Sequence, residues 1–209
     1  MPLRPDGRGA VHLDNKNNAR SESALVERCR GGDREAQRTL FEQTYDRIHR
    51  LLLRMTGNSD DAADLMQETY LKGFAQIARF DGRSSVGTWL YKIAVNEALQ
   101  FFRRAKSLRV KLGDVAQEHR NGAYTSDATE IRLDVRSALA MMDPSDRAIL
   151  LLRHQEGQDY RTIAEVMGCA EGTVASRLSR SRERLRGMLQ ESYGSSEESG
   201  APAHPKGSP

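Results

Sequence analysis

Helical periodicity is the feature that most limits the folds open to this chain. Apolar residues recur at spacings of three and four in two separate blocks of the 209-residue sequence, residues 23–105 and residues 131–190. Phe41, Tyr45 and Ile48 illustrate the spacing. No stretch sustains the apolar–polar alternation of a half-buried strand. The pattern predicts an all-α chain with one small helical domain in each block.

The three remaining segments carry little periodicity. Residues 1–22 are polar, and 11 of the last 18 residues are Ser, Gly or Pro, which is typical of disorder. We therefore expect residues 1–22 and residues 191–209 to be disordered. Residues 106–130 hold only scattered apolar side chains, and we expect a flexible linker there, longer than the loops inside a compact domain.

Glycine and capping residues mark the expected helix ends. Gly57 is expected to end one helix, and Asn58 or Ser59 to cap the next. In the second block, Asp159 is expected to cap a helix and Gly168 to make the tight turn that follows it.

Charge is distributed unevenly, although the formal net charge is only +3. Residues 92–111 contain six basic residues and one acidic residue, whereas residues 58–70 contain four acidic residues and no basic one. Such separation predicts surfaces for partners of opposite sign. No apolar run approaches the roughly 20 residues that cross a bilayer, and no secretory leader is evident. We expect a cytoplasmic protein whose two distant cysteines, Cys29 and Cys169, stay reduced.

Residues 159–178, DYRTIAEVMGCAEGTVASRL, have the layout of a helix-turn-helix. Ile163 would face inward on a short helix, and Val174 and Leu178 would pack a second helix against it. Such a second helix fits the DNA major groove. Its outward side chains are expected to be Thr173, Ser176, Arg177 and Arg180. An ordinary helical hairpin in a bundle core is the alternative.

Two further segments could contact partners. Residues 60–74, DDAADLMQETYLKGF, place several acidic side chains on one helix face, which suits a basic protein partner, a divalent metal ion or only solvent. Residues 80–106 combine a polar loop with a helix that carries Trp89, amides and an Arg pair. Aromatic, amide and basic groups together suit an unstacked base, although Trp89 could equally belong to the core.

The motifs DAADLMQETYLKGF, SSVGTWLYKIAVNEALQFFRR and LLLRHQEGQDYRTIAEVMGCAEGTVASRLSRSRERLR follow one another in this order. At these residues the chain resembles bacterial sigma factors of the extracytoplasmic-function (ECF) group of the sigma-70 family. The resemblance implies a promoter-melting and core-binding domain, a linker, and a helix-turn-helix domain that reads the minus-thirty-five element. It also implies core RNA polymerase (clamp and flap), promoter DNA and an anti-sigma factor as partners, with no catalysis, metal or cofactor.

The family pattern implies three sets of contact residues in this chain. The polymerase-binding set is Asp61, Asp64, Gln67, Glu68 and Thr69. The minus-ten DNA set is Phe80, Asp81, Gly82, Ser84, Ser85, Trp89, Asn96, Gln100, Arg103 and Arg104. The minus-thirty-five DNA set is Glu171, Thr173, Ser176, Arg177, Arg180, Arg182 and Arg184.

Two other hypotheses fit parts of the sequence. A DNA-binding regulator that never joins polymerase would explain the helix-turn-helix but leaves the acidic helix without a role. A metal-dependent enzyme would use the carboxylates of residues 60–68, but the sequence shows neither a second ligand cluster nor a nucleophile–base pair. The leading hypothesis is therefore an alternative sigma factor that directs core polymerase to promoters and helps to melt the minus-ten element.

Overall fold

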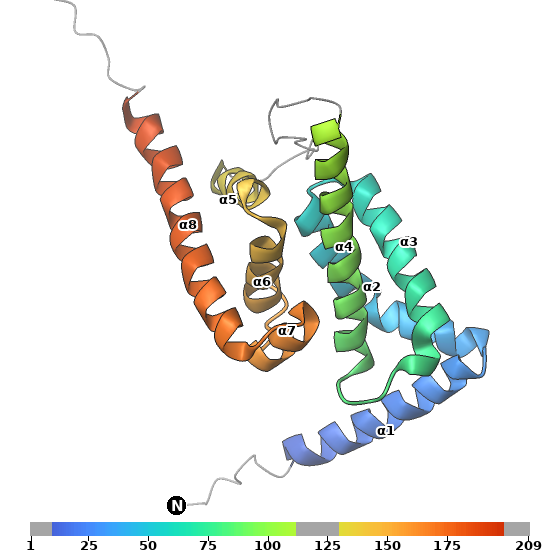
Figure 1. Ribbon diagram of the computed structural model, residues 1–209. Helices are drawn as coiled ribbons and strands as arrows, with labels where there is room; N and C mark the ends of the chain where they lie inside the picture. The colour runs from blue at the N-terminus through green and yellow to red at the C-terminus, as the bar shows by residue number, and fades with distance from the viewer. Residues whose placement is uncertain (1–9, 112–129, 199–209) are drawn as a thin grey trace, which may run out of the picture.

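A computed structural model describes residues 10–111 and 130–198 and confirms the all-α prediction, since these residues contain helices and no strand (Figure 1). The elements are α1 (Ala10–Arg30), α2 (Arg34–Thr56), α3 (Ser59–Gln76), the 3-10 helix η1 (Ile77–Arg79), α4 (Val86–Lys111), α5 (Glu130–Met141), α6 (Pro144–His154), α7 (Tyr160–Met167) and α8 (Glu171–Glu198). Within these parts of the chain, no helix is both long and apolar enough to span a bilayer.

Helices α2, α3 and α4 form the first bundle, and α1 lies across the end of it where α3 ends and α4 begins (Figure 1). The connection from α2 to α3 follows the sequence prediction. Gly57 ends α2 in the left-handed conformation with φ 72°. Asn58 caps α3, because its side-chain oxygen accepts from the backbone N–H of Asp60 at 2.8 Å and of Asp61 at 3.0 Å.

The second bundle contains α5 to α8 and includes the predicted helix-turn-helix, formed by α7 and α8. Asp159 caps α7 by accepting from the backbone N–H of Thr162 at 2.7 Å. Gly168 ends α7 with φ 64°, which a residue with a Cβ rarely adopts. Helix α8 then packs along α5 and α6.

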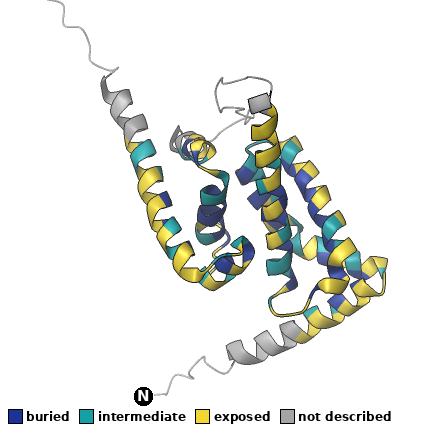
Figure 2. Ribbon diagram, in the orientation of Figure 1, coloured by how far each residue is buried: buried dark blue, intermediate teal, exposed yellow. Residues whose placement is uncertain are grey.

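The core follows the inward faces of the helices, as the burial colours in Figure 2 show. Ile163, Val174 and Leu178 are fully buried, so the predicted packing of the helix-turn-helix is confirmed. In the first bundle, Leu52 and Met55 of α2 are equally inaccessible. Removal of this apolar surface from water is the main stabilising contribution to both bundles.

Several helices extend beyond the boundaries expected from the sequence. Helix α1 begins at Ala10, α4 reaches Lys111 and α8 reaches Glu198, in segments where disorder or a linker was predicted. In α4, Ala, Lys, Leu and Arg favour helix after the apolar period has ended. The remainder of those segments, residues 1–9, 112–129 and 199–209, lies outside the described residues.

Arg147 of α6 joins the two bundles through a buried guanidinium group. Its nitrogens donate to the backbone carbonyl of Met55 at the end of α2, and to the carbonyls of Ala140 at 2.6 Å and Met142 at 3.2 Å. The guanidinium carbon also lies 5.3 Å from the ring centre of Phe102 in α4. One charged group thus contacts α2, α4 and α5 from α6.

Glu156 makes a second polar link between the bundles. Its carboxylate accepts a 2.7 Å hydrogen bond from the hydroxyl of Tyr91 in α4 and lies 3.8 Å from the guanidinium of Arg47 in α2. Burial, with the carboxylate beside it, raises the pKa of Tyr91 far above its ordinary value, so this phenol stays a donor. The contacts of Arg147 and of Glu156 between the bundles are thus both made by polar side chains.

We predict that Arg147→Ala lowers the free energy of unfolding by about 2–4 kcal/mol, because it leaves buried carbonyls without their charged donor. Urea denaturation measures this quantity. Arg161→Ala, at an exposed position on α7, is the matched control and should change stability by less than about 0.5 kcal/mol. Equal stability of the two variants would contradict the central role of Arg147.

Candidate functional site

The acidic face of α3 is available to a partner. Asp64, Gln67 and Glu68 are exposed, and Asp61 is half-buried. Thr69 departs from the prediction, because it is fully buried and its hydroxyl donates to the backbone carbonyl of Leu65 at 2.7 Å. Thr69 is therefore a core residue beneath the acidic face and not part of its exposed surface.

An apolar groove between α2 and α3 adjoins this face. Its lining includes Phe41, Tyr45, Met66 and Phe74, and Leu71 beside it leaves 58% of its surface exposed. Tyr70 also lines the groove, and its hydroxyl oxygen lies 2.6 Å from the hydroxyl oxygen of Thr44. Burial raises the pKa of Tyr70 to about 12. The acidic face and the groove together present charge beside exposed apolar surface.

The loop between η1 and α4 is only partly exposed. Asp81, Gly82 and Ser85 face solvent, and Ser84 is half-buried. Phe80 departs from the prediction of direct DNA contact, because it is buried and its ring packs against Trp89 with ring centres 5.6 Å apart.

Phe80 thus anchors the loop. Trp89 is itself half-buried and belongs to the same packing.

Helix α4 presents amide and basic groups along one exposed face. Asn96, Gln100, Arg103 and Arg104 are all exposed, and Arg104 donates to the side-chain oxygen of Gln100 at 3.3 Å. The opposite side of α4 is buried. The exposed face therefore has the donors, acceptors and positive charge that unpaired bases and a phosphate backbone need.

The first turns of α8 carry the outward residues of the helix-turn-helix. Glu171, Thr173, Ser176 and Arg180 are exposed, as predicted. Arg177 was also predicted to point outward, but it is only partly exposed.

The Arg177 guanidinium instead contacts one carboxylate oxygen of Asp146 in α6 at 2.6 and 2.9 Å, and the Arg177 side chain is only 25% exposed. Asp146 thus ties the recognition helix to α6.

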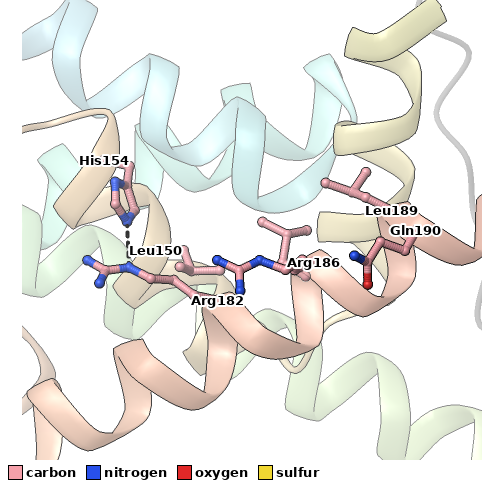
Figure 3. Close-up of a pocket in the computed structure, with 7 residues that line it drawn as sticks. Leu150, His154, Arg182, Arg186, Leu189 and Gln190 are labelled. Atoms are coloured by element: carbon pink, nitrogen blue, oxygen red, sulfur yellow. Dashed lines mark hydrogen bonds between the residues drawn. The ribbon is translucent and has the colours of Figure 1, made fainter. Parts of the chain in front are cut away.

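The later arginines of α8 point in different directions because successive helical residues are about 100° apart. Arg184 is exposed. Arg182 and Arg186 line a groove between α6 and α8, together with Leu150 and Leu189 (Figure 3).

Arg182 donates to Nε2 of His154 at 3.2 Å in this groove. Partial burial, followed by the charges of Arg182 and Arg153, lowers the pKa of His154, so the ring accepts this bond as neutral imidazole. Arg182 was predicted to contact DNA; its side chain is exposed and bonds to His154 in this groove.

Sequence reasoning missed three features of these surfaces. Asp146, which holds Arg177, gave no signal, because its partner is 31 residues away. Glu22 and Arg30 contact the loop from α1, again over long separations. Leu71 could have been found, since it is an apolar residue on the polar side of an amphipathic helix.

A metal site was the third sequence hypothesis for the acidic helix. Among the described residues, no three His, Cys, Asp or Glu side chains come together in a way that could hold a metal ion.

Two family descriptions match this chain. Residues 40–108 match Sigma-70 region 2, and residues 132–185 match Sigma-70, region 4. The first span covers most of α2, all of α3 and η1, the loop and nearly all of α4, and the second covers most of α5, all of α6 and α7, and the first half of α8.

Curated relatives match over most of their length. The ECF RNA polymerase sigma-E factor of Haemophilus influenzae is 31% identical over 183 residues, which cover 81% of this chain and 96% of that protein. The RNA polymerase sigma-H factor of Pseudomonas aeruginosa is 32% identical over 182 residues, covering 81% and 94%.

Solved structures agree in fold. The sigma factor RpoE from Bartonella quintana, in complex with the anti-sigma factor NepR, has a TM-score of 0.61 at 26% identity, covering 73% of this chain and 96% of that one. CnrH, in complex with the cytosolic domain of CnrY, also has a TM-score of 0.61, at 19% identity, covering 81% and 97%.

Proposed function

This chain belongs to the extracytoplasmic-function sigma factors of the sigma-70 family, and from that premise we propose how its surfaces divide the work of transcription initiation. It is an alternative sigma factor that directs RNA polymerase to specific promoters. This division of roles is supported by one observation: the acidic face on α3 is separate from the amide and basic faces on α4 and α8. Since core polymerase and chromosomal DNA are cytoplasmic, we place the protein there.

The acidic face of α3 docks on the clamp coiled coil of the largest polymerase subunit. Asp64 and Glu68 supply charge, and Gln67 adds a hydrogen-bonding group at the rim of the apolar groove. An interface with apolar contact at its centre and charge at its edge gains both affinity and orientation.

We predict that the double charge reversal Asp64→Lys with Glu68→Lys weakens binding to core polymerase at least about tenfold, or about 1.4 kcal/mol, because like charges then meet. Fluorescence anisotropy of labelled protein with sigma-free core enzyme measures the affinity. Glu35→Lys with Glu165→Lys makes the same change in net charge at exposed positions on α2 and α7 and is the control.

Equal affinity of the two double variants would remove α3 from the interface. Loss of core binding in the α3 variant alone would also exclude a DNA-binding regulator that acts without polymerase.

The loop before α4 and the exposed face of α4 hold the melted minus-ten element. The exposed loop residues Asp81, Gly82 and Ser85 receive an unstacked base, and Asn96 and Gln100 offer amide groups to base edges. Arg103 and Arg104 then neutralise the backbone. Phe80 and Trp89 support this surface from within.

The start of α8 enters the major groove at the minus-thirty-five element. Thr173, Ser176 and Arg180 face outward near its N-terminus, where helix-turn-helix proteins contact bases. Arg177 fixes the angle of α8 through Asp146, and Arg184 contacts phosphate. The groove with Arg182 and Arg186 lies on another side of α8 and receives the polymerase flap.

We predict that Arg180→Ala weakens binding of the holoenzyme to a promoter fragment by roughly 1–3 kcal/mol, because a good base contact is worth that much. The loss should disappear on a fragment whose minus-thirty-five element is scrambled. Arg161→Ala, exposed on α7, is the control and should keep full affinity. A loss of the same size on both fragments would make Arg180 a phosphate contact, and no loss would remove it from the interface.

An anti-sigma factor is the remaining proposed partner. The Bartonella sigma factor, which shares the fold, was solved with its anti-sigma factor bound. The exposed apolar grooves on the two bundles give such a protein places to bind, and occupation of either one would exclude polymerase.

A further inference from the structure

Helix α1 touches the loop between η1 and α4 from outside the first bundle. It lies across the bundle end at which α3 finishes and α4 starts (Figure 1). No residue of α1 belongs to the proposed polymerase or DNA contacts, yet two of its charged side chains, Glu22 and Arg30, reach the two ends of this loop.

Arg30 holds the entrance of the loop. Its Nε donates to the backbone carbonyl of Ile77 at 3.3 Å, and its Nη2 donates to the backbone carbonyl of Phe80. Glu27, one turn earlier on α1, contacts Nη1 at 2.5 Å and orients the guanidinium. A planar donor group with two carbonyl partners fixes the direction of the chain as it leaves η1.

Glu22 holds the exit of the loop. Its carboxylate oxygen Oε1 accepts from the backbone N–H of Val86, the first residue of α4, at 2.6 Å. The first N–H groups of a helix have no partner within the helix, and negative charge there is favourable. Ser85 completes the cap, since its hydroxyl oxygen accepts from the N–H of Thr88 at 3.0 Å.

Between these two ends the polar contacts of the loop are short-range: Arg83 pairs with Asp81 at 3.0 Å, and Ser85 contacts Thr88. Asp81 accepts from the backbone N–H of Arg83 at 3.2 Å, and Gly82 takes a left-handed conformation with φ 72°. Phe80 is buried at the entrance and anchors only that side. The path of residues 81–85 therefore depends in part on where α1 holds the two loop ends.

We infer that Glu22 and Arg30 are positioning residues for minus-ten recognition and set its base preference without touching DNA. The inference rests on the proposed role of the loop in receiving an unstacked base. A base is selected by hydrogen bonds to its edge, which fail when their partners move by about 1 Å. A loop freed from α1 would still bind single-stranded DNA by charge but would discriminate less between bases.

The test is transcription in vitro by holoenzyme formed from the full chain and sigma-free core polymerase. The template is a promoter, mapped with the wild-type protein, in which the minus-ten element is randomised and the minus-thirty-five element is kept. Sequencing of the transcripts gives the base preference at each minus-ten position.

We expect Arg30→Ala and Glu22→Ala to reduce the preference at the most selective position about tenfold, the size of a lost base contact.

Conservative variants on α1 separate positioning from general stability. Glu22→Gln keeps a carbonyl oxygen at the same reach and should keep most of the preference, whereas Glu22→Asp withdraws the carboxylate and should lose part of it. Arg30→Lys, which can reach only one carbonyl well, should also lose part. Arg28→Ala is the matched control, because the Arg28 guanidinium lies 2.7 Å from the carboxylate of Asp33 and does not contact the loop.

Unchanged preference in Arg30→Ala and Glu22→Ala, or a uniform fall in transcript yield with unchanged preference, would overturn the inference. If either alanine variant fails to fold, Glu22→Asp and Arg30→Lys decide the question by the same readout. A wild-type holoenzyme that starts transcription without any minus-ten preference would instead refute the proposed role of the loop.

Discussion

The buried guanidinium of Arg147 is the interaction on which the arrangement of the two bundles depends. A charge removed from water costs several kcal/mol unless it is well paired, so its surroundings must supply acceptors. The carbonyls of Met55, Ala140 and Met142 do so, and the ring of Phe102 covers one side. Since these groups belong to α2, α4, α5 and the turn before α6, the guanidinium sets how the bundles meet.

Polar side chains link the bundles at a second point, within a contact that also includes apolar core residues of both bundles. Glu156 is held by Tyr91 and Arg47 of the first bundle. The fully buried Ile163, Val174 and Leu178 keep the helix-turn-helix intact as a unit.

Local signals in the sequence predicted local structure well. Gly57, Asn58, Asp159 and Gly168 act at the helix ends as expected, because caps and left-handed turns depend on residues only a few positions apart. The apolar period also located the two bundles, since burial of one helix face is what produces that period.

Side chains departed from their expected exposure where their environment depends on distant parts of the chain. Thr69 and Phe80 match positions that the family pattern assigns to contacts, yet both are buried here. Arg177 was expected to point outward, but in the structure it forms an ion pair with Asp146 of α6. The contacts of Glu22 with Val86 and of Arg30 with Phe80 span 64 and 50 residues, and no periodicity encodes them.

The most direct test of the account is transcription in vitro on sheared genomic DNA with sigma-free core polymerase, with and without this protein, followed by sequencing of RNA 5′ ends. If each bundle reads one promoter element, discrete new start sites appear that share two upstream elements. An unchanged set of 5′ ends, from protein that still binds DNA, would contradict it and leave the acidic face of α3 without a partner.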